Sequence, residues 1–166
     1  METERPKINL IPSSTDKIVE VLGWIILLVL WGYNISHYSS LPDTIPTHFN
    51  ATGEADGFGS KVSIIGLPVI ATLLFIGLTV LNRYPHSFNY PTAITEDNAL
   101  RLYTLATRML RYLKLVLVLV FGGIEFMTIQ NATGEASGLG VWFLPLTLVL
   151  IFIPLIYFVV KSLKSN

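Results

Sequence analysis

Four long apolar runs, each close to the length of a membrane-crossing helix, dominate this sequence. They cover about 18–38, 62–82, 112–130 and 139–160. A helix needs about 20 apolar residues to cross a hydrocarbon layer of roughly 30 Å. Only 13% of the 166 residues are charged, whereas a soluble domain carries about 25%. We therefore predict an all-α integral membrane protein in which residues 1–166 form a single membrane domain with four transmembrane helices.

The distribution of lysine and arginine predicts how these helices are oriented. Ten of the eleven cations lie before the first run, between the second and third, or after the fourth, and Lys61 is the exception. Such residues concentrate on the cytoplasmic side of membrane proteins. We therefore expect a multi-pass cell-membrane protein with both termini and the loop 83–111 in the cytoplasm. The loops 39–61 and 131–138 should then lie outside the cell. Each of them joins the two helices of one helix–loop–helix hairpin.

The composition excludes several classes of function. The chain has no cysteine, which excludes disulfide frameworks, zinc–thiolate sites and cysteine nucleophiles. Its formal net charge is zero, so bulk charge gives no support for nucleic-acid binding. The sequence has neither a nucleophile elbow nor a His-Glu-x-x-His motif, which hydrolases use. We expect no enzymatic activity and no cofactor.

A ten-residue polar segment occurs twice, after the first and after the third apolar run. Residues 50–59 are NATGEADGFG and residues 131–140 are NATGEASGLG, so eight of ten positions are identical. The identity stops at the edges of the segment. A parallel internal repeat would place both copies on one side of the membrane. We expect two loops of similar shape, packed side by side on the outer face.

Glycines in the first copy indicate what form this outer face takes. Gly53, Gly57 and Gly59 supply positions that can adopt positive φ, and Asp-Gly is a turn dipeptide. Residues 47–50 and 58–61 are compatible with β-strands. We therefore expect a small ordered polar cap, for which a β-hairpin is one candidate form, and residues 128–131 could pair with it.

The third apolar run belongs to a longer predicted helix. Thr95 followed by Glu96 and Asp97 is typical of a helix start, and the helical pattern continues to about residue 130. Residues 96–111 should then project into water or lie at the interface. The basic residues of this helix either signal orientation or bind anionic headgroups; they are Arg101, Arg108, Arg111 and Lys114. In the second run, Pro68 predicts a kink.

The loop after the first run resembles a known membrane domain. Its Pro42-Asp43, the stretch from Ile45 to Asn50, and the later Gly-Glu, Asp-Gly and Gly-Ser-Lys elements follow a membrane span directly. This pattern resembles a widespread bacterial and archaeal membrane domain of unknown function, which also forms the N-terminal part of SdpI-type bacteriocin immunity proteins. The resemblance covers about residues 18–81. It implies an immunity role, although likeness of fold alone does not establish function.

The two outer loops hold most of the candidate site residues. The motif positions are Pro46, His48, Asn50, Gly53, Glu54, Asp56, Gly57, Gly59, Lys61, Asn131, Gly134 and Glu135. Imidazole and carboxylate groups together suit zinc, manganese or calcium. His48 with Asp43, Glu54 and Asp56 could therefore bind a metal, or these side chains could simply cap and turn a surface loop.

Among the polar residues within the apolar runs, three are candidate site residues: Asn34, His37 and Glu125. An acid inside a membrane helix is costly and is by default a candidate functional residue. Glu125 could serve a proton or ion path. It could equally have a structural partner, and the candidates are His37, Asn34 and Lys61.

Three functions are compatible with these features. The first is a non-enzymatic membrane protein with an SdpI-like immunity or sensory role, which binds a partner through its outer loops. The second is a small transporter or channel component that uses Glu125, and the third is a metal-dependent membrane enzyme. The expected partners are the lipid bilayer, an extracellular peptide or membrane protein, and a second copy of the chain, without nucleic acid.

Overall fold

Capping residues fix the starts of two long helices. Ser13 and Asp16 form a reciprocal capping box at the start of α1 (Ser14–His37). Thr95 and Asn98 form the same device at the start of α3 (Glu96–Ala132). In each box two backbone N–H groups that would lack a helical partner are satisfied. The predicted helix start at residues 95–97 is confirmed.

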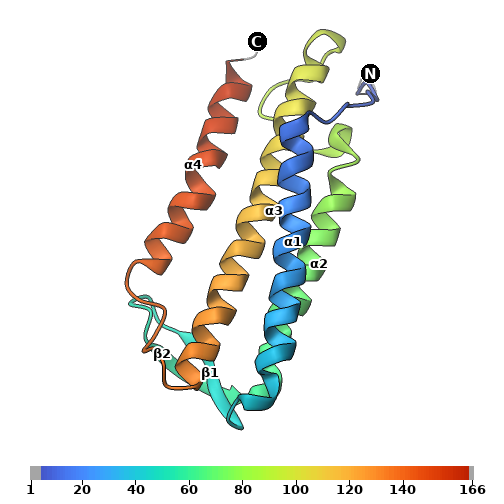
Figure 1. Cartoon of the computed structure of the whole chain (residues 1–166). Coiled ribbons are helices and arrows are strands. Elements are labelled where there is room, and N and C mark those ends of the chain that lie inside the picture. Colours follow the sequence, from blue (N-terminus) through green and yellow to red (C-terminus); the bar gives the residue numbers. More distant parts are fainter. Residues whose placement is uncertain (1–4, 165–166) are drawn as a thin grey trace.

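The computed structural model describes residues 5–164 and contains four long helices that run side by side (Figure 1). The other two are α2 (Gly66–Leu81) and α4 (Phe143–Leu163). All four are long and apolar enough to cross a membrane, if the short helix before α2 is counted with it. The prediction of a mostly helical, multi-pass membrane protein with four candidate spans is confirmed at this level.

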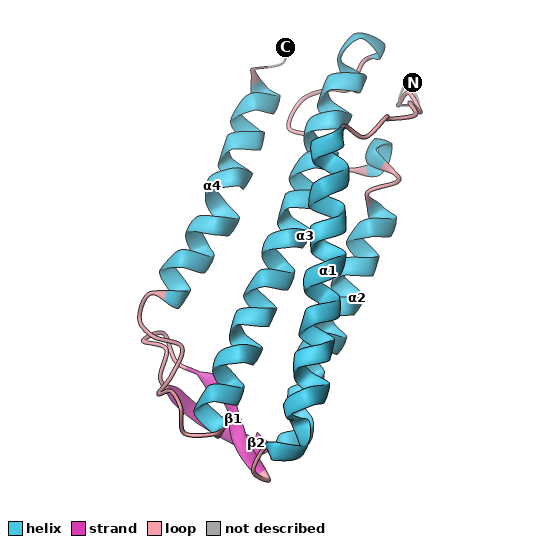
Figure 2. Cartoon of the chain, in the orientation of Figure 1, coloured by secondary structure: helices cyan, strands magenta, loops and turns pink. Residues whose placement is uncertain are grey.

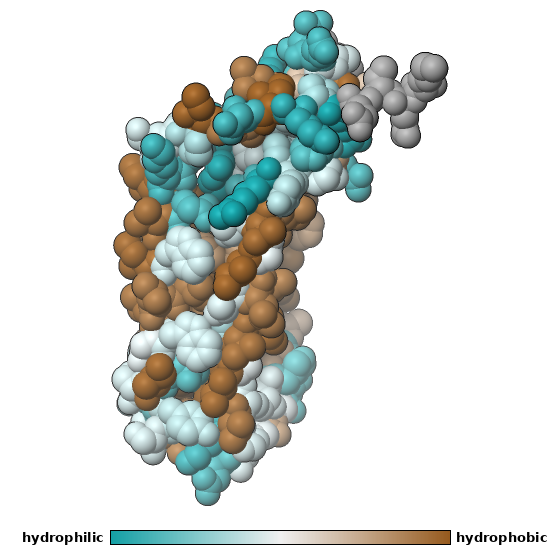
Figure 3. Space-filling view, turned by 90° about the vertical axis from the view of Figure 1, so that its right-hand side faces the viewer, coloured by the Kyte–Doolittle hydropathy of each residue, from teal (hydrophilic) through white to brown (hydrophobic). Residues whose placement is uncertain are grey.

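The two ends of the bundle differ in structure. The beginning and the end of the described chain lie at one end, here called the termini end, and a small sheet closes the other, here called the hairpin end (Figure 1). On the face shown in Figure 3, hydrophobic residues gather along the middle of the molecule, and hydrophilic residues are concentrated towards its two ends. This banded surface is the pattern expected of a protein surrounded by lipid at its middle.

The sheet is a β-hairpin of β1 (Thr44–Phe49) and β2 (Ala55–Ser60), which pair antiparallel (Figure 2). The hairpin form of the cap is thus confirmed. Ile45 is buried and packs with Ile64 and Ile129, which seats β1 on the helices. Residues 128–131 belong to α3. The expectation that they pair with the hairpin is wrong, because the helical pattern of α3 continues through them.

Pro68 lies in the first turn of α2. A 3-10 helix, η2 (Lys61–Ile65), precedes it and takes up the first part of the apolar run. The predicted kink inside the span is therefore wrong, since a proline in the first turn removes no hydrogen bond that the helix needs. Pro154, by contrast, lies inside α4.

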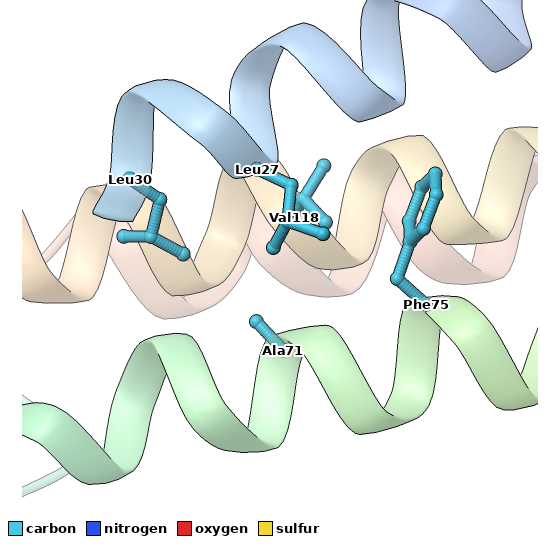
Figure 4. Packing of buried hydrophobic residues seen from close by; sticks show 5 residues of the cluster. All are labelled: Leu27, Leu30, Ala71, Phe75 and Val118. Carbon is cyan, nitrogen blue, oxygen red and sulfur yellow. The ribbon is translucent and has the colours of Figure 1, made fainter. Parts of the chain in front are cut away.

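The core lies between α1, α2 and α3. Leu27, Leu30, Ala71, Phe75 and Val118 point into the space shared by these helices (Figure 4). In the most apolar 18-residue stretch of α4 no residue is buried. In the corresponding stretch of α3 one third of the residues are buried. The structure is therefore a three-helix core with a peripheral fourth helix, which packs mainly on α3.

Gly23 allows α1 and α2 to approach closely, and this gives a testable prediction. A Cβ at Gly23 would lie 2.7 Å from a ring atom of Phe75, whereas a Cβ at Gly32 would meet nothing within 4 Å. We expect Gly23→Leu to lower the free energy of unfolding by about 1–3 kcal/mol through overpacking. Gly32→Leu, in the same helix, is the matched control. Thermal unfolding in detergent measures both, and equal melting temperatures would contradict the packing.

Candidate functional site

Residues 50–54 of the first copy form the turn of the β-hairpin, and residues 55–59 belong to β2. The Asn50 Oδ1 atom accepts hydrogen bonds from the backbone N–H of Thr52 at 3.0 Å and of Glu54 at 2.9 Å. It also accepts one from the Thr52 hydroxyl at 2.7 Å. Gly53 adopts a φ of +83°, which a side chain would make costly. Asn50 and Gly53 together fix this turn.

The second copy has a different structure, although its sequence is nearly the same. Asn131 lies in the last turn of α3 and donates hydrogen bonds to the carbonyls of Met127 and Gly138. Its Oδ1 atom accepts from the Gly138 N–H. Only the glycine is used in the same way, since Gly134 has a φ of +79°. The expectation of two loops of similar shape is wrong, because the preceding residues are strand in one copy and helix in the other.

The two copies are nevertheless in direct contact, as expected. The Leu139 N–H donates to the Gly53 carbonyl at 2.6 Å. Gly53 and Gly140 approach so closely that a Cβ on Gly53 would lie 2.6 Å from the Gly140 oxygen. The chain from the end of α3 to the start of α4 is thereby attached to the hairpin turn, and both form one cap at the hairpin end.

A groove of about 570 Å³ separates the hairpin from this second loop. Thr52, Glu54 and Phe58 line it from the hairpin side, and Asn131, Ser137 and Val141 line it from the other side. Phe58 is 64% exposed and Val141 is 70% exposed. The groove therefore combines polar walls with two large apolar side chains that contact water or a partner.

The four candidate metal ligands do not gather at one point. His48 Nδ1 pairs with Asp56 Oδ1 across the hairpin at 2.5 Å. Asp43 pairs with Lys61 at 3.2 Å, and Glu54 accepts a hydrogen bond from Asn50 at 3.2 Å. Within residues 5–164 no group of three or more histidine or acidic side chains could hold a metal ion. These side chains act instead as pairs that hold the hairpin in shape.

The other motif positions serve the hairpin as well. Pro46 lies opposite Phe58 in the register. A Cβ on Gly57 would lie 2.9 Å from the His48 side chain, and one on Gly59 would lie 3.1 Å from Thr47. Glu135 lies in the second loop, where its backbone N–H bonds back to the end of α3. The expected motif residues thus lie together at the hairpin end.

Glu125 is fully buried, and neither of its oxygens has a hydrogen-bond partner within residues 5–164. Of its three expected partners, His37 bonds to Tyr33 and Ser36, and Lys61 pairs near the surface. The Asn34 side chain lies close enough to interact with the Glu125 carboxyl group, and its amide also donates to the Ile64 carbonyl at 3.3 Å. Glu125 is therefore a buried acid that forms no ion pair within residues 5–164 and has Asn34 as its polar neighbour.

A second polar cluster, at the termini end, was not predicted. Lys114 is only 1% exposed, and its Nζ atom donates to Glu20 at 2.6 Å and to Thr79 at 2.7 Å. The same atom lies 4.7 Å from the centre of the Phe75 ring. This arrangement joins α1, α2 and α3 through one buried charge.

The cluster continues outward along α1 and α3. Asp16 pairs with Arg108 at 3.2 Å, and Arg111 lies 3.9 Å from both Asp16 and Glu20. Complementary spacing could have revealed it. Asp16 and Glu20 are four residues apart, which places them on one face of α1. The cations of α3 that meet them are spaced by three residues, so they also share one helix face, at the same depth. The basic row of α3 is thus not only an orientation signal, because three of its members face carboxylates.

Comparisons with known proteins give a family without an assigned activity. Residues 25–72 match the family described as Domain of unknown function (DUF1648). An uncharacterized protein of Archaeoglobus fulgidus is 34% identical over 173 residues, which cover 95% of this chain and 94% of the relative. No solved structure matches. The match at residues 25–72 confirms the resemblance to a membrane domain of unknown function.

Proposed function

This chain belongs to the same family as the uncharacterized Archaeoglobus fulgidus protein, and we propose that it is a non-enzymatic membrane protein whose cap binds a polypeptide partner. In this proposal the cap comprises the β-hairpin and residues 131–142. An immunity or sensory role, as in SdpI-type proteins, is the form of partner binding that we favour. The groove between the two copies of the repeated segment is the observation that carries the proposal.

The charges support an outward-facing cap. The described lysines and arginines other than Lys61 belong to segments at the termini end, and such residues mark the cytoplasmic side. The hairpin end instead carries acids, which are Asp43, Glu54, Asp56 and Glu135. An outward-facing cap with this balance favours a partner that carries positive charge.

The groove has the features of a protein-binding surface. Phe58 and Val141 are apolar anchors surrounded by polar side chains, and such an arrangement is typical of binding hot spots. In the described structure β2 pairs only with β1. Its other edge can accept an extended peptide by strand addition. An extended segment of an extracellular polypeptide therefore fits the cap best.

The experiment compares protection of cells against secreted peptides. Cells that lack the protein and cells that produce it are exposed to fractions of the source organism's spent medium, and growth is measured. We expect protection in the producing cells. Phe58→Asp should abolish it, because a charge replaces the apolar anchor of the groove. Thr44→Asp, an exposed change on β1 outside the groove, is the matched control and should leave protection intact.

The unaltered protein and its two variants must be inserted in the membrane in equal amounts, which immunoblots of membranes measure. The proposal predicts that partner association, measured by co-purification with the peptide of the growth-inhibiting fraction, is lost together with protection. If no fraction distinguishes producing cells from cells without the protein, the immunity role is excluded. If Phe58→Asp protects as well as the unaltered protein, the groove is not the binding surface.

A small transporter or channel component is the second candidate, because of Glu125. A fully buried carboxyl without a neighbouring cation is costly to ionise, so Glu125 suits a group that exchanges a proton or binds a passing cation. We expect Glu125→Gln to abolish proton or sodium flux in proteoliposomes under this alternative. The same change should not lower the melting temperature, since glutamine has the same shape and no charge.

Glu135→Gln is the matched control for this prediction, because Glu135 is an exposed acid at the hairpin end. It should change neither flux nor stability. Absence of any flux with the unaltered protein would rule out the transporter alternative. A large loss of stability in Glu125→Gln would show instead that the carboxylate has a structural role.

A further inference from the structure

We propose that a groove at the termini end binds the phosphate-containing headgroup of an anionic membrane lipid. The groove has a volume of about 570 Å³ and lies beside the buried cluster of charges. Lys17, Glu20 and Trp24 line it from α1, and Thr79, Asn82 and Arg83 line it at the end of α2. Arg111 and Lys114 line it from α3.

The charges that line the groove leave a surplus of positive charge. Two acids contribute to the lining, Asp16 and Glu20. Four cations do so as well: Lys17, Arg83, Arg111 and Lys114. The two acids already have hydrogen-bond donors. Asp16 accepts from Ser13 and Arg108, and Glu20 accepts from Lys114.

Three of these cations keep donors for a ligand. Within residues 5–164, Lys17 and Arg83 form no ion pair. Arg111 approaches Asp16 and Glu20 only to 3.9 Å, a distance at which no hydrogen bond forms. Lysine and arginine around a pocket suit phosphate, which accepts several charge-assisted hydrogen bonds. The groove is thus complementary to one phosphate group.

One feature favours a lipid over a free phosphate ion, and a second is compatible with a lipid headgroup. Val21 and Trp24 form an exposed apolar wall of the groove, and an acyl chain can lie against it. In addition, Asn82 Oδ1 is buried and has no hydrogen-bond donor within residues 5–164. A headgroup hydroxyl, such as those of the glycerol in phosphatidylglycerol, supplies such a donor. Basic pockets between membrane helices bind anionic headgroups in this way.

Native mass spectrometry of the full-length protein in neutral detergent tests the proposal. The probes are phosphatidylglycerol, phosphatidylcholine and inorganic phosphate. We expect phosphatidylglycerol to bind more tightly than phosphatidylcholine. The double variant Lys17→Gln with Arg83→Gln should weaken phosphatidylglycerol binding by about tenfold or more, because both charges contact the headgroup.

The matched control is Lys7→Gln with Arg101→Gln, which removes two exposed cations that do not line the groove. It should leave phosphatidylglycerol binding unchanged. Three results would overturn the proposal: equal binding of the two lipids, equal loss in both double variants, or competition by inorganic phosphate at the lipid's own concentration. Circular dichroism and melting temperatures of the variants ensure that a lost fold is not read as lost binding.

Discussion

Removal of the Glu20 carboxylate by Glu20→Ala is expected to lower the free energy of unfolding by about 2–3 kcal/mol. The change leaves the Lys114 ammonium group buried with Thr79 as its one remaining hydrogen-bond acceptor. An unpaired buried charge costs more than the pair contributed when intact. The value lies below that for a fully buried pair, because the Glu20 side chain is still 25% exposed.

Two further variants separate pairing from simple loss of packing. Lys114→Met combined with Glu20→Gln removes both charges, and we expect its stability to return to within about 1 kcal/mol of the unaltered protein. Asp43→Ala breaks the exposed ion pair with Lys61. This control should cost less than about 1 kcal/mol, as is usual for surface pairs.

Thermal unfolding in a neutral detergent at low ionic strength measures these effects. The order of stability should be Glu20→Ala lowest, the double variant higher, and Asp43→Ala closest to the unaltered protein. If Glu20→Ala and Asp43→Ala melt at the same temperature, Lys114 is not held in a buried pair. A double variant no more stable than Glu20→Ala would show that packing, not charge, determines the loss.

Much of the fold follows from local sequence patterns. The apolar runs predict the four helices, because each run alone is long enough to cross a bilayer. The capping pattern at Thr95 predicts where α3 starts. The glycines of the first copy suggest the hairpin, but Asp56-Gly57 lies in β2 and the turn with its positive φ is at Gly53. Pro68 was misinterpreted, because the sequence does not show that the helix begins only at Gly66. A proline's effect depends on its distance from the helix start.

The candidate site was predictable only in part, because its contacts join distant segments. The repeated segment identifies the residues of the cap, but the same five letters, NATGE, form a hairpin turn once and a helix end once. Tertiary context decides between these structures. The pairing of Lys114 with Glu20 joins residues 94 positions apart. It depends on which helix faces pack together, and periodicity alone does not give that.

The contact between the two copies gives the second large effect. Gly53→Ala is expected to detach the second loop from the hairpin, because its Cβ would lie 2.6 Å from the Gly140 oxygen and 2.8 Å from the Gly140 nitrogen. Backbone atoms cannot move aside as a flexible side chain can. The φ of +83° adds strain of about 1 kcal/mol or more for any residue with a Cβ.

Hydrogen exchange measures this detachment directly. The Leu139 N–H, which bonds to the Gly53 carbonyl, should lose its protection in Gly53→Ala, as should amides of residues 131–141. The melting of the three-helix core should change little, because Leu27, Ala71 and Val118 belong to a different cluster from the residues that seat the hairpin. Protection of cells by the protein should be lost as well, since the groove needs both of its walls.

Gly134→Ala is the matched control, because Gly134 occupies the same place in the second copy. Its φ of +79° imposes similar strain, but a Cβ there would meet nothing within 4 Å. The difference between the two variants therefore isolates the close approach of the loops from the backbone strain. If both variants show the same hydrogen exchange at residues 131–141, the two copies are not held together at Gly53, and the groove between them is not a fixed surface.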